Sequence, residues 1–202
     1  VPFANESGIS PIDIARLADL VTNEIEGVHG LRTVPVNRVI TAMRALNLPA
    51  VTSPQEATAL MNALNVDGVL VGTVTTWDAF PPLRVGMAVE LFQRSPSDPP
   101  VLDPRELLRS PTGSPLPAEA DRQSLSASGV FDAANHDVRA SMQAYARGRH
   151  VPDSAFGPRI YEMRMELFTQ FVSHRLTADL LAQQAQRQVQ AGQTVAQTDA
   201  PR

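Results

Sequence analysis

The chain has 202 residues, 43% of them apolar, which is enough to bury the core of one large domain or of one domain with an appendage. Its formal charge is −4, and its 17 basic residues, all arginine, are scattered among 21 carboxylates, which excludes the concentrated basic face that nucleic-acid binding requires. The lack of cysteine excludes disulfides, thiolate metal sites and cysteine nucleophiles, and no window approaches the roughly 18 apolar residues of a membrane-spanning helix.

The first predicted helix runs from Ser10 to about Glu26. A serine followed by proline is typical of a helix start, because the hydroxyl caps backbone N–H groups and proline is tolerated in the first turn. Gly27 and Gly30 are predicted to end the helix. Apolar residues at three- and four-residue steps give it one face toward a core: Ile14, Leu17, Ala18, Val21 and Ile25.

Three short elements follow this helix. The run from Leu31 to Val36 is rich in β-formers and predicts a strand. Asn37 is a candidate cap for a second helix, and Ser53 with Glu56 has the spacing of a capping box at the start of a third. Their apolar faces would hold Val39, Ile40, Met43 and Leu46, and then Ala57, Leu60, Met61 and Leu64.

Two neighbouring strands are predicted next. Residues 69–75 are β-branched and apolar on both faces, which is typical of a central strand buried between layers. From Arg84 to Gln93 apolar residues alternate with small or polar ones, which predicts an antiparallel partner that is covered on one face.

The middle of the chain is the least regular part. Proline, serine and aspartate dominate residues 95–122, so we expect an excursion with little regular structure. Ser124 to Phe131 then predicts a further strand. Asp132 is expected to cap a helix from Ala134 to Arg147, with Gly148 at its end.

The last predicted helix begins near Pro158 and carries two apolar stripes. Either both stripes pack within this chain, or one of them meets a partner. Beyond Leu181 the pattern stops, so residues 182–202 are predicted to be a tail that is disordered or docks on a partner. The stripes are Ile160, Met163, Leu167, Phe171, Ala178 and Leu181, and Met165, Phe168, Val172, Leu176 and Leu180.

Three segments of the first half resemble a known family. The start, VPFANESG, resembles the first strand and loop of envelope lipoprotein domains found in penicillin-binding-protein activators, the curli-secretion channel subunit and the TolB amino-terminal domain. The segments ARLADLVTNE (15–24) and LNVDGVLVGTVT (64–75) resemble the helix and the strand that follow in that family. The resemblance implies an envelope lipoprotein domain whose lipidated cysteine would lie before Val1. The amphipathic hairpins of the curli channel have no counterpart here, so a pore is not expected.

The predicted fold class is α/β (α+β), a small mixed sheet packed by helices with long carboxy-terminal helices. Four regions are expected. Residues 1–94 form the core that resembles the envelope domains, and 95–122 form the excursion. Residues 123–181 add a strand and two helices, and 182–202 form the tail rich in glutamine and alanine.

The sequence predicts no catalytic, metal or cofactor site. His29, His136, His150 and His174 lack the spacing that places two imidazoles on one helical face. No serine lies in a Gly-x-Ser-x-Gly turn, and the phosphate-binding loop that ends in lysine cannot occur without lysine. A serine, histidine and carboxylate trio assembled in space is the route left open to a hydrolase.

Three groups of residues are candidates for contact with protein partners. Trp77, Phe80 and Pro81 follow the central strand as a rigid aromatic tip, or fold back over the sheet edge. Arg147 and Arg149 would grip an anion such as a carboxylate or a lipid headgroup, or serve the end of their helix. The third group is the second stripe of the last helix, represented by Phe168, Val172 and Leu176.

Together these patterns favour a non-catalytic structural or adaptor domain of a bacterial envelope assembly that works through protein contacts, as a homo-oligomer or within a larger complex. The expected location, periplasmic or associated with the outer membrane, rests on the resemblance alone, and membrane association would come from an upstream anchor. The alternatives are a regulatory lipoprotein that activates a cell-wall synthase and a small-molecule hydrolase with a pocket formed by the excursion. Fold analogy does not choose among them.

Overall fold

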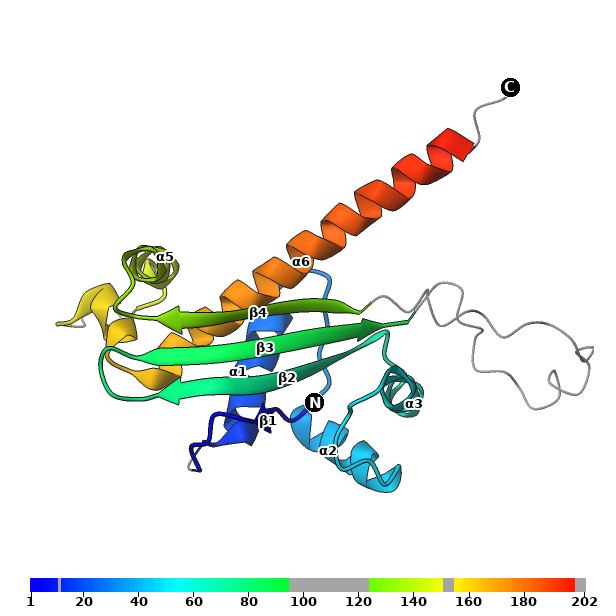
Figure 1. Ribbon diagram of the computed structural model, residues 1–202, viewed down its shortest axis with the longest axis horizontal. Coiled ribbons are helices and arrows are strands. Elements are labelled where there is room, and N and C mark those ends of the chain that lie inside the picture. The colour runs from blue at the N-terminus through cyan, green and yellow to red at the C-terminus, as the bar shows by residue number, and fades with distance from the viewer. Residues whose placement is uncertain (11, 95–123, 151–154, 199–202) are drawn as a thin grey trace, which may run out of the picture.

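The computed structural model describes residues 1–10, 12–94, 124–150 and 155–198, with side chains as far as Val189. Within these residues the fold is α/β: a four-stranded mixed sheet packed by helices, with one long helix at the carboxy-terminal end (Figure 1). The predicted fold class is therefore confirmed. The predicted excursion at 95–122 lies outside the described residues.

The sheet is a three-stranded antiparallel meander with a very short parallel strand at one edge. Its order is β1 (Ala4–Asn5), β2 (Gly68–Asp78), β3 (Arg84–Gln93) and β4 (Leu125–Asp132). β1 runs parallel to β2, whereas β2, β3 and β4 are antiparallel neighbours. The predicted positions of the two adjacent strands and of the strand at Ser124–Phe131 are confirmed.

Two helices cover the inner face of the sheet. α1 (Ile14–Glu26) and α6 (Met165–Thr198) both pass behind the strands in Figure 1 and pack against each other. Alternation along β3 points Val85, Met87 and Val89 toward them, and all three are buried. Burial of this apolar face, at about 25 cal/mol per Å², stabilises the main core.

A second, smaller core lies beside the beginning of β2. It is formed by α2 (Val36–Ala45) and α3 (Pro54–Leu64) together with Val69 of β2. The predicted capping box starts α3: the Ser53 hydroxyl accepts from the Glu56 backbone N–H, and the Glu56 carboxylate accepts from the Ser53 backbone N–H. The sequence pattern and the structure agree here because a capping box is closed by residues three apart.

The predicted strand at Leu31–Val36 is wrong. Residues 31–35 have no regular structure, and α2 begins at Val36 with Pro35 as its cap, so Asn37 lies inside the helix and does not cap it. A strand needs a neighbour to receive its hydrogen bonds, and none runs beside this segment in the part of the chain that the structure describes.

Two other predicted helix caps are also wrong. α1 begins at Ile14, and its cap is Asp13, whose carboxylate accepts from the Arg16 backbone N–H; the predicted cap was Ser10. α5 (His136–Ala146) is capped by Asn135, while Asp132 accepts two hydrogen bonds from the Arg84 guanidinium at 2.7 and 3.0 Å. Serine, aspartate and asparagine are nearly equivalent as helix caps, so residue type alone did not show which of two nearby candidates caps each helix.

The last helix begins later and ends later than predicted. A 3₁₀ helix, η2 (Gly157–Glu162), occupies its expected start, and α6 begins at Met165. α6 then continues through Thr198, past Leu181, so residues 182–198 are helical, and their docking on a partner stays a prediction. With 34 residues, α6 is about 50 Å long. It projects beyond the sheet (Figure 1).

Candidate functional site

The loop between β2 and β3 presents an exposed phenylalanine. Phe80 has 82% of its surface exposed, and its backbone N–H donates to the Asp78 carboxylate at 3.1 Å. The Pro81–Pro82 peptide bond is cis, Pro81 is exposed, and Leu83 beside them is fully buried and anchors the loop. Trp77 turns inward against the main core. Phe80 therefore forms the exposed aromatic tip that the sequence offered as one alternative, whereas Trp77 folds back against the body of the protein, as the other alternative had it.

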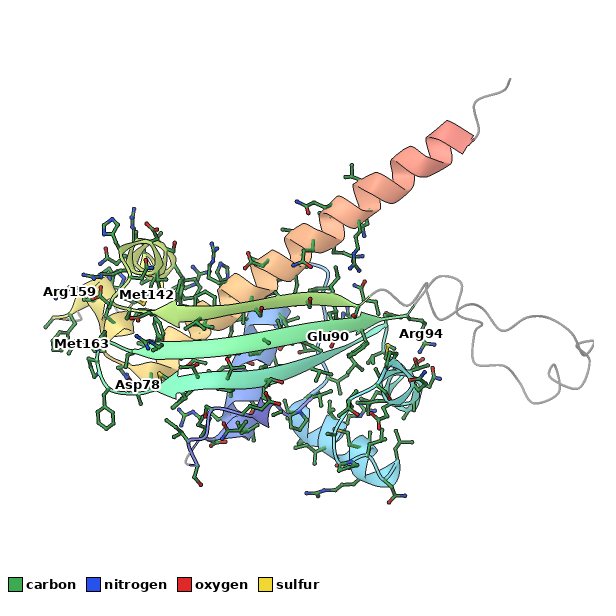
Figure 2. All side chains as sticks on the ribbon, in the orientation of Figure 1. Asp78, Glu90, Arg94, Met142, Arg159 and Met163 are labelled. Atoms are coloured by element: carbon green, nitrogen blue, oxygen red, sulfur yellow. The ribbon has the colours of Figure 1, made fainter. Side chains whose placement is uncertain are left out.

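This loop and the opposite end of the sheet lie far apart. Asp78 ends β2 at one end of the sheet, whereas Arg94 follows β3 at the other end (Figure 2). Any partner that contacts Phe80 would therefore approach the end of the sheet where α5 and η2 lie (Figure 1).

The two arginines after α5 have different environments. Arg147 is the residue at the end of the helix and is exposed. The Arg149 guanidinium lies 4.2 Å from the centre of the Tyr145 ring and donates to the Tyr145 carbonyl at 3.0 Å. A cation over an aromatic face and a hydrogen bond to a terminal carbonyl both stabilise the helix end. Arg149 therefore serves its helix through its side chain, whereas Arg147 contributes its backbone N–H, which donates to the Gln143 carbonyl at 3.2 Å.

A polar cluster that sequence reasoning missed joins α1, α5 and α6. The Tyr145 hydroxyl donates to the Glu24 carboxylate at 2.7 Å, and His174 Nδ1 lies 3.5 Å from the other Glu24 oxygen. The Tyr145 and His174 rings lie 4.8 Å apart. Burial raises the pKa of Tyr145 far above its usual range, and the hydrogen bond to Glu24 raises this pKa further. The phenol therefore stays neutral and donates a hydrogen bond, and its contacts connect α1, α5 and α6.

The second stripe of the last helix lies inside this chain. Phe168 and Val172 are fully buried and Leu176 is 2% exposed, all in the main core beneath the sheet. These three residues were candidates for contact with a partner, and the structure corrects that prediction. The stripe is buried because α6 packs against both β4 and α1. Two faces of α6 are therefore covered by other parts of this chain.

Farther along, α6 is attached to the free edge of the sheet by two long side chains. Gln183 donates to the Ser126 carbonyl at 2.9 Å, and Arg187 donates to the Ser124 carbonyl at 2.8 Å. These carbonyls lie on the edge of β4 that no strand covers within the described residues. Val189 is 60% exposed. The helix therefore leaves the body at a defined angle and carries apolar surface outward.

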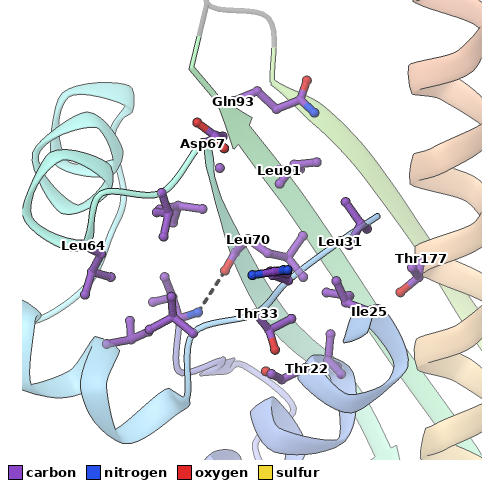
Figure 3. A pocket seen from close by; sticks show the side chains of 18 of the residues that line it. Thr22, Ile25, Leu31, Thr33, Leu64, Asp67, Leu70, Leu91, Gln93 and Thr177 are labelled. Carbon is purple, nitrogen blue, oxygen red and sulfur yellow. Dashed lines mark hydrogen bonds between the residues drawn. The ribbon is translucent and has the colours of Figure 1, made fainter. Parts of the chain in front are cut away.

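A cavity of about 600 Å³ opens beside the ends of β2 and β3 that adjoin Gly68 and Gln93 (Figure 3). α1 crosses behind the middle of these strands, so their ends extend past it (Figure 1). Leu70 and Leu91 belong to the inner face of the sheet but are only half-buried, because the loop at residues 28–35 replaces a helix there. Sequence reasoning missed the cavity, which is built by segments distant along the chain.

The described residues contain no group of three histidine, aspartate or glutamate side chains placed to hold a metal ion. Among the same residues, no helix combines the length and the apolar character needed to cross a membrane. No protein-family model, curated protein or solved structure matches the chain.

Proposed function

We propose that this domain is a non-catalytic structural or adaptor module of a bacterial envelope assembly and that it works through contacts with other proteins. The observation that carries the proposal is the course of α6, which leaves its own core and extends outward as a continuous helix to Thr198. The periplasmic or outer-membrane setting is supported by the resemblance of residues 1–94 to envelope lipoprotein domains.

Helices in proteins are stabilised mainly by packing of an apolar face, and isolated helices are marginal in water. The first half of α6 has this packing through Phe168, Val172 and Leu176. Of the described side chains beyond Leu180, none is buried, and the exposed Val189 would gain from burial against another chain. Docking of this part on a protein partner would supply the packing that the sheet does not.

The loop with Phe80 offers a second contact point. An aromatic side chain is a favoured anchor in interfaces, and a loop restricted by two prolines and by the Asp78 hydrogen bond loses little entropy on binding. The loop and the projecting helix extend from different parts of the body (Figure 1). A module with two separated contact points suits a role that connects components of an assembly.

The test is the native mass of the tagged protein purified from its own cells, with every co-purifying chain identified. We expect a large complex for the wild type. Val189→Glu is expected to shift most of the protein to the monomer, because a charge placed in an apolar interface costs a factor of about ten or more in affinity.

Val130→Glu is the matched control, because Val130 is 63% exposed on β4 and lies away from the projecting helix. It is expected to leave the complex intact. A wild-type protein that is entirely monomeric in its own cells would overturn the proposal. Equal loss of the complex in both variants would show that the projecting helix is not a specific contact surface of the complex.

A further inference from the structure

The cavity beside the ends of β2 and β3 is lined mainly by apolar side chains; its polar lining includes the half-buried Thr22 and Thr33 and the exposed Arg32 and Asp67. Its buried lining comes from six segments, among them Val21 of α1, Leu60 of α3 and Leu180 of α6. At about 600 Å³ it falls within the roughly 300–1,000 Å³ of small-molecule sites. Water gains few hydrogen bonds against such walls, so an apolar group that displaces the water would be favoured.

The opening carries one positive and one negative side chain. Figure 3 shows Asp67 and Gln93 at one end of the cavity, and Leu31 and Thr33 on the loop that faces them. Arg32 lies between these last two residues in sequence and is exposed, as is Asp67. Neither the Arg32 guanidinium nor the Asp67 carboxylate forms an ion pair or hydrogen bond within the described residues.

We propose that this cavity binds a single-chain zwitterionic phospholipid, with its acyl chain inside and its head group at the opening. The apolar walls fit an unbranched hydrocarbon chain. Arg32 would pair with the phosphate, since a guanidinium matches phosphate geometry, and Asp67 would pair with the amine across the opening. A purely anionic or purely cationic head would meet a like charge on one of these two side chains.

The acyl chain is tested with a series of lysophosphatidylethanolamines of 10, 12 and 14 carbons (roughly the lengths that span such cavities), titrated calorimetrically below their critical micelle concentrations. Saturable binding of one molecule per chain is expected. The affinity should rise about fourfold for each added methylene until the cavity is full. Absence of saturable binding, or affinity that does not depend on chain length, would overturn the proposal.

Two variants fill the cavity from different elements. Ile25 of α1 and Leu91 of β3 are half-buried and lie at the cavity in Figure 3, so Ile25→Trp and Leu91→Trp have room for the larger ring. Each should weaken binding by about tenfold or more, the equivalent of roughly two methylenes. Val130→Trp makes a similar change on the exposed face of β4 and should bind as the wild type does. Wild-type affinity in both cavity variants, with their folds intact by circular dichroism, would overturn the site.

The head group is tested with charge reversals at the opening. Arg32→Glu and Asp67→Arg should each weaken the lysophospholipid by about two- to fivefold, as expected for exposed charges, and the double variant should recover affinity because the head group can turn round. Myristate keeps an acyl chain but has only a negative head, so it should bind the wild type more weakly, and Asp67→Arg should reverse that order. Equal affinity of the wild type for both ligands would overturn the zwitterionic assignment and identify the site as one for fatty acids.

Discussion

The Tyr145 hydroxyl donates a 2.7 Å hydrogen bond to the Glu24 carboxylate, which joins α5 to α1 across 121 positions of the sequence. His174 of α6 lies beside the same carboxylate, and the Tyr161 ring meets Tyr145 edge to face at 5.8 Å. Four elements therefore meet at one partly buried phenol. Its hydrogen bond is the polar counterpart of the apolar contacts between these helices.

Removal of this hydroxyl should lower the stability of the fold. Tyr145→Phe leaves the Glu24 carboxylate without its phenol donor, and we expect a loss of about 1–2 kcal/mol in the free energy of unfolding, measured with urea. Tyr161→Phe is the control, because the Tyr161 hydroxyl has no hydrogen-bond partner within the described residues; its effect should stay below about 0.5 kcal/mol. Equal losses in the two variants would show that the hydrogen bond to Glu24 contributes no more to stability than the unpaired Tyr161 hydroxyl does.

The two tyrosines should also make stability depend on alkaline pH. The chain has only these two, and burial raises the pKa of both Tyr145 and Tyr161 in the folded state. Unfolded tyrosines ionise near pH 10. Their contribution to stability is thus complete below about pH 10 and declines above it, because the unfolded chain loses these protons first.

Spectrophotometric titration checks this expectation. In the native protein, phenolate absorbance should develop above pH 10, whereas in urea both tyrosines should titrate near their ordinary value of about 10. Tyr145→Phe leaves Tyr161 as the only phenol and should halve the absorbance change. Native titration near pH 10 would contradict the burial of both rings.

The capping box of α3 should make stability depend on acidic pH. Hydrogen bonds from Thr52, and then from Ser53, lower the pKa of the Glu56 carboxyl in the folded state. Its contribution is therefore complete above the unfolded pKa of about 4.3 and is lost as the pH falls through the lower folded pKa. Glu56→Gln should flatten the fall of the thermal midpoint as the pH drops below the unfolded pKa of about 4.3.

Ser53→Ala tests the other half of the box. Loss of the hydroxyl that accepts from the Glu56 N–H should cost about 1 kcal/mol in the free energy of unfolding. Ser128→Ala, on exposed β4, should cost almost nothing. A similar loss at both positions would argue against the cap.

Gly72 should tolerate no side chain while Phe3 is in place. A Cβ atom at Gly72 would overlap the Phe3 ring, which packs directly on this strand. Gly72→Ala is expected to cost about 1–3 kcal/mol or more, as overpacked cores do. Combination with Phe3→Leu should recover part of the loss, because the smaller side chain can move aside. Additive losses in a double-mutant cycle would contradict the contact.

Substitution by alanine should have a large effect on stability in the packed part of α6 and a small effect in its projecting part. Phe168→Ala should cost about 3–5 kcal/mol, since the ring is fully buried. Val189→Ala should change the free energy of unfolding by less than about 0.5 kcal/mol. A large loss at Val189 in the isolated chain would show that the projecting helix packs on its own body.

The amino-acid sequence by itself determined the elements whose signals are local. Alternation along Arg84–Gln93 indicated a strand covered on one face, and the spacing of Ser53 and Glu56 located the start of α3. The periodicity of Leu17, Ala18 and Val21 indicated the buried side of α1. These signals suffice because a strand repeats every two residues and a helix every three to four, whatever lies around them.

Only the tertiary structure decided which surfaces those elements meet. The stripe with Phe168 could face a partner or the sheet, and the crossing of α6 over β4 and α1 decided for the sheet. The Tyr145–Glu24 bond and the cavity between Leu70 and Leu31 join residues far apart in sequence, so no spacing predicts them. Leu31–Val36 had the composition of a strand, yet a strand forms only where a neighbouring strand receives its hydrogen bonds.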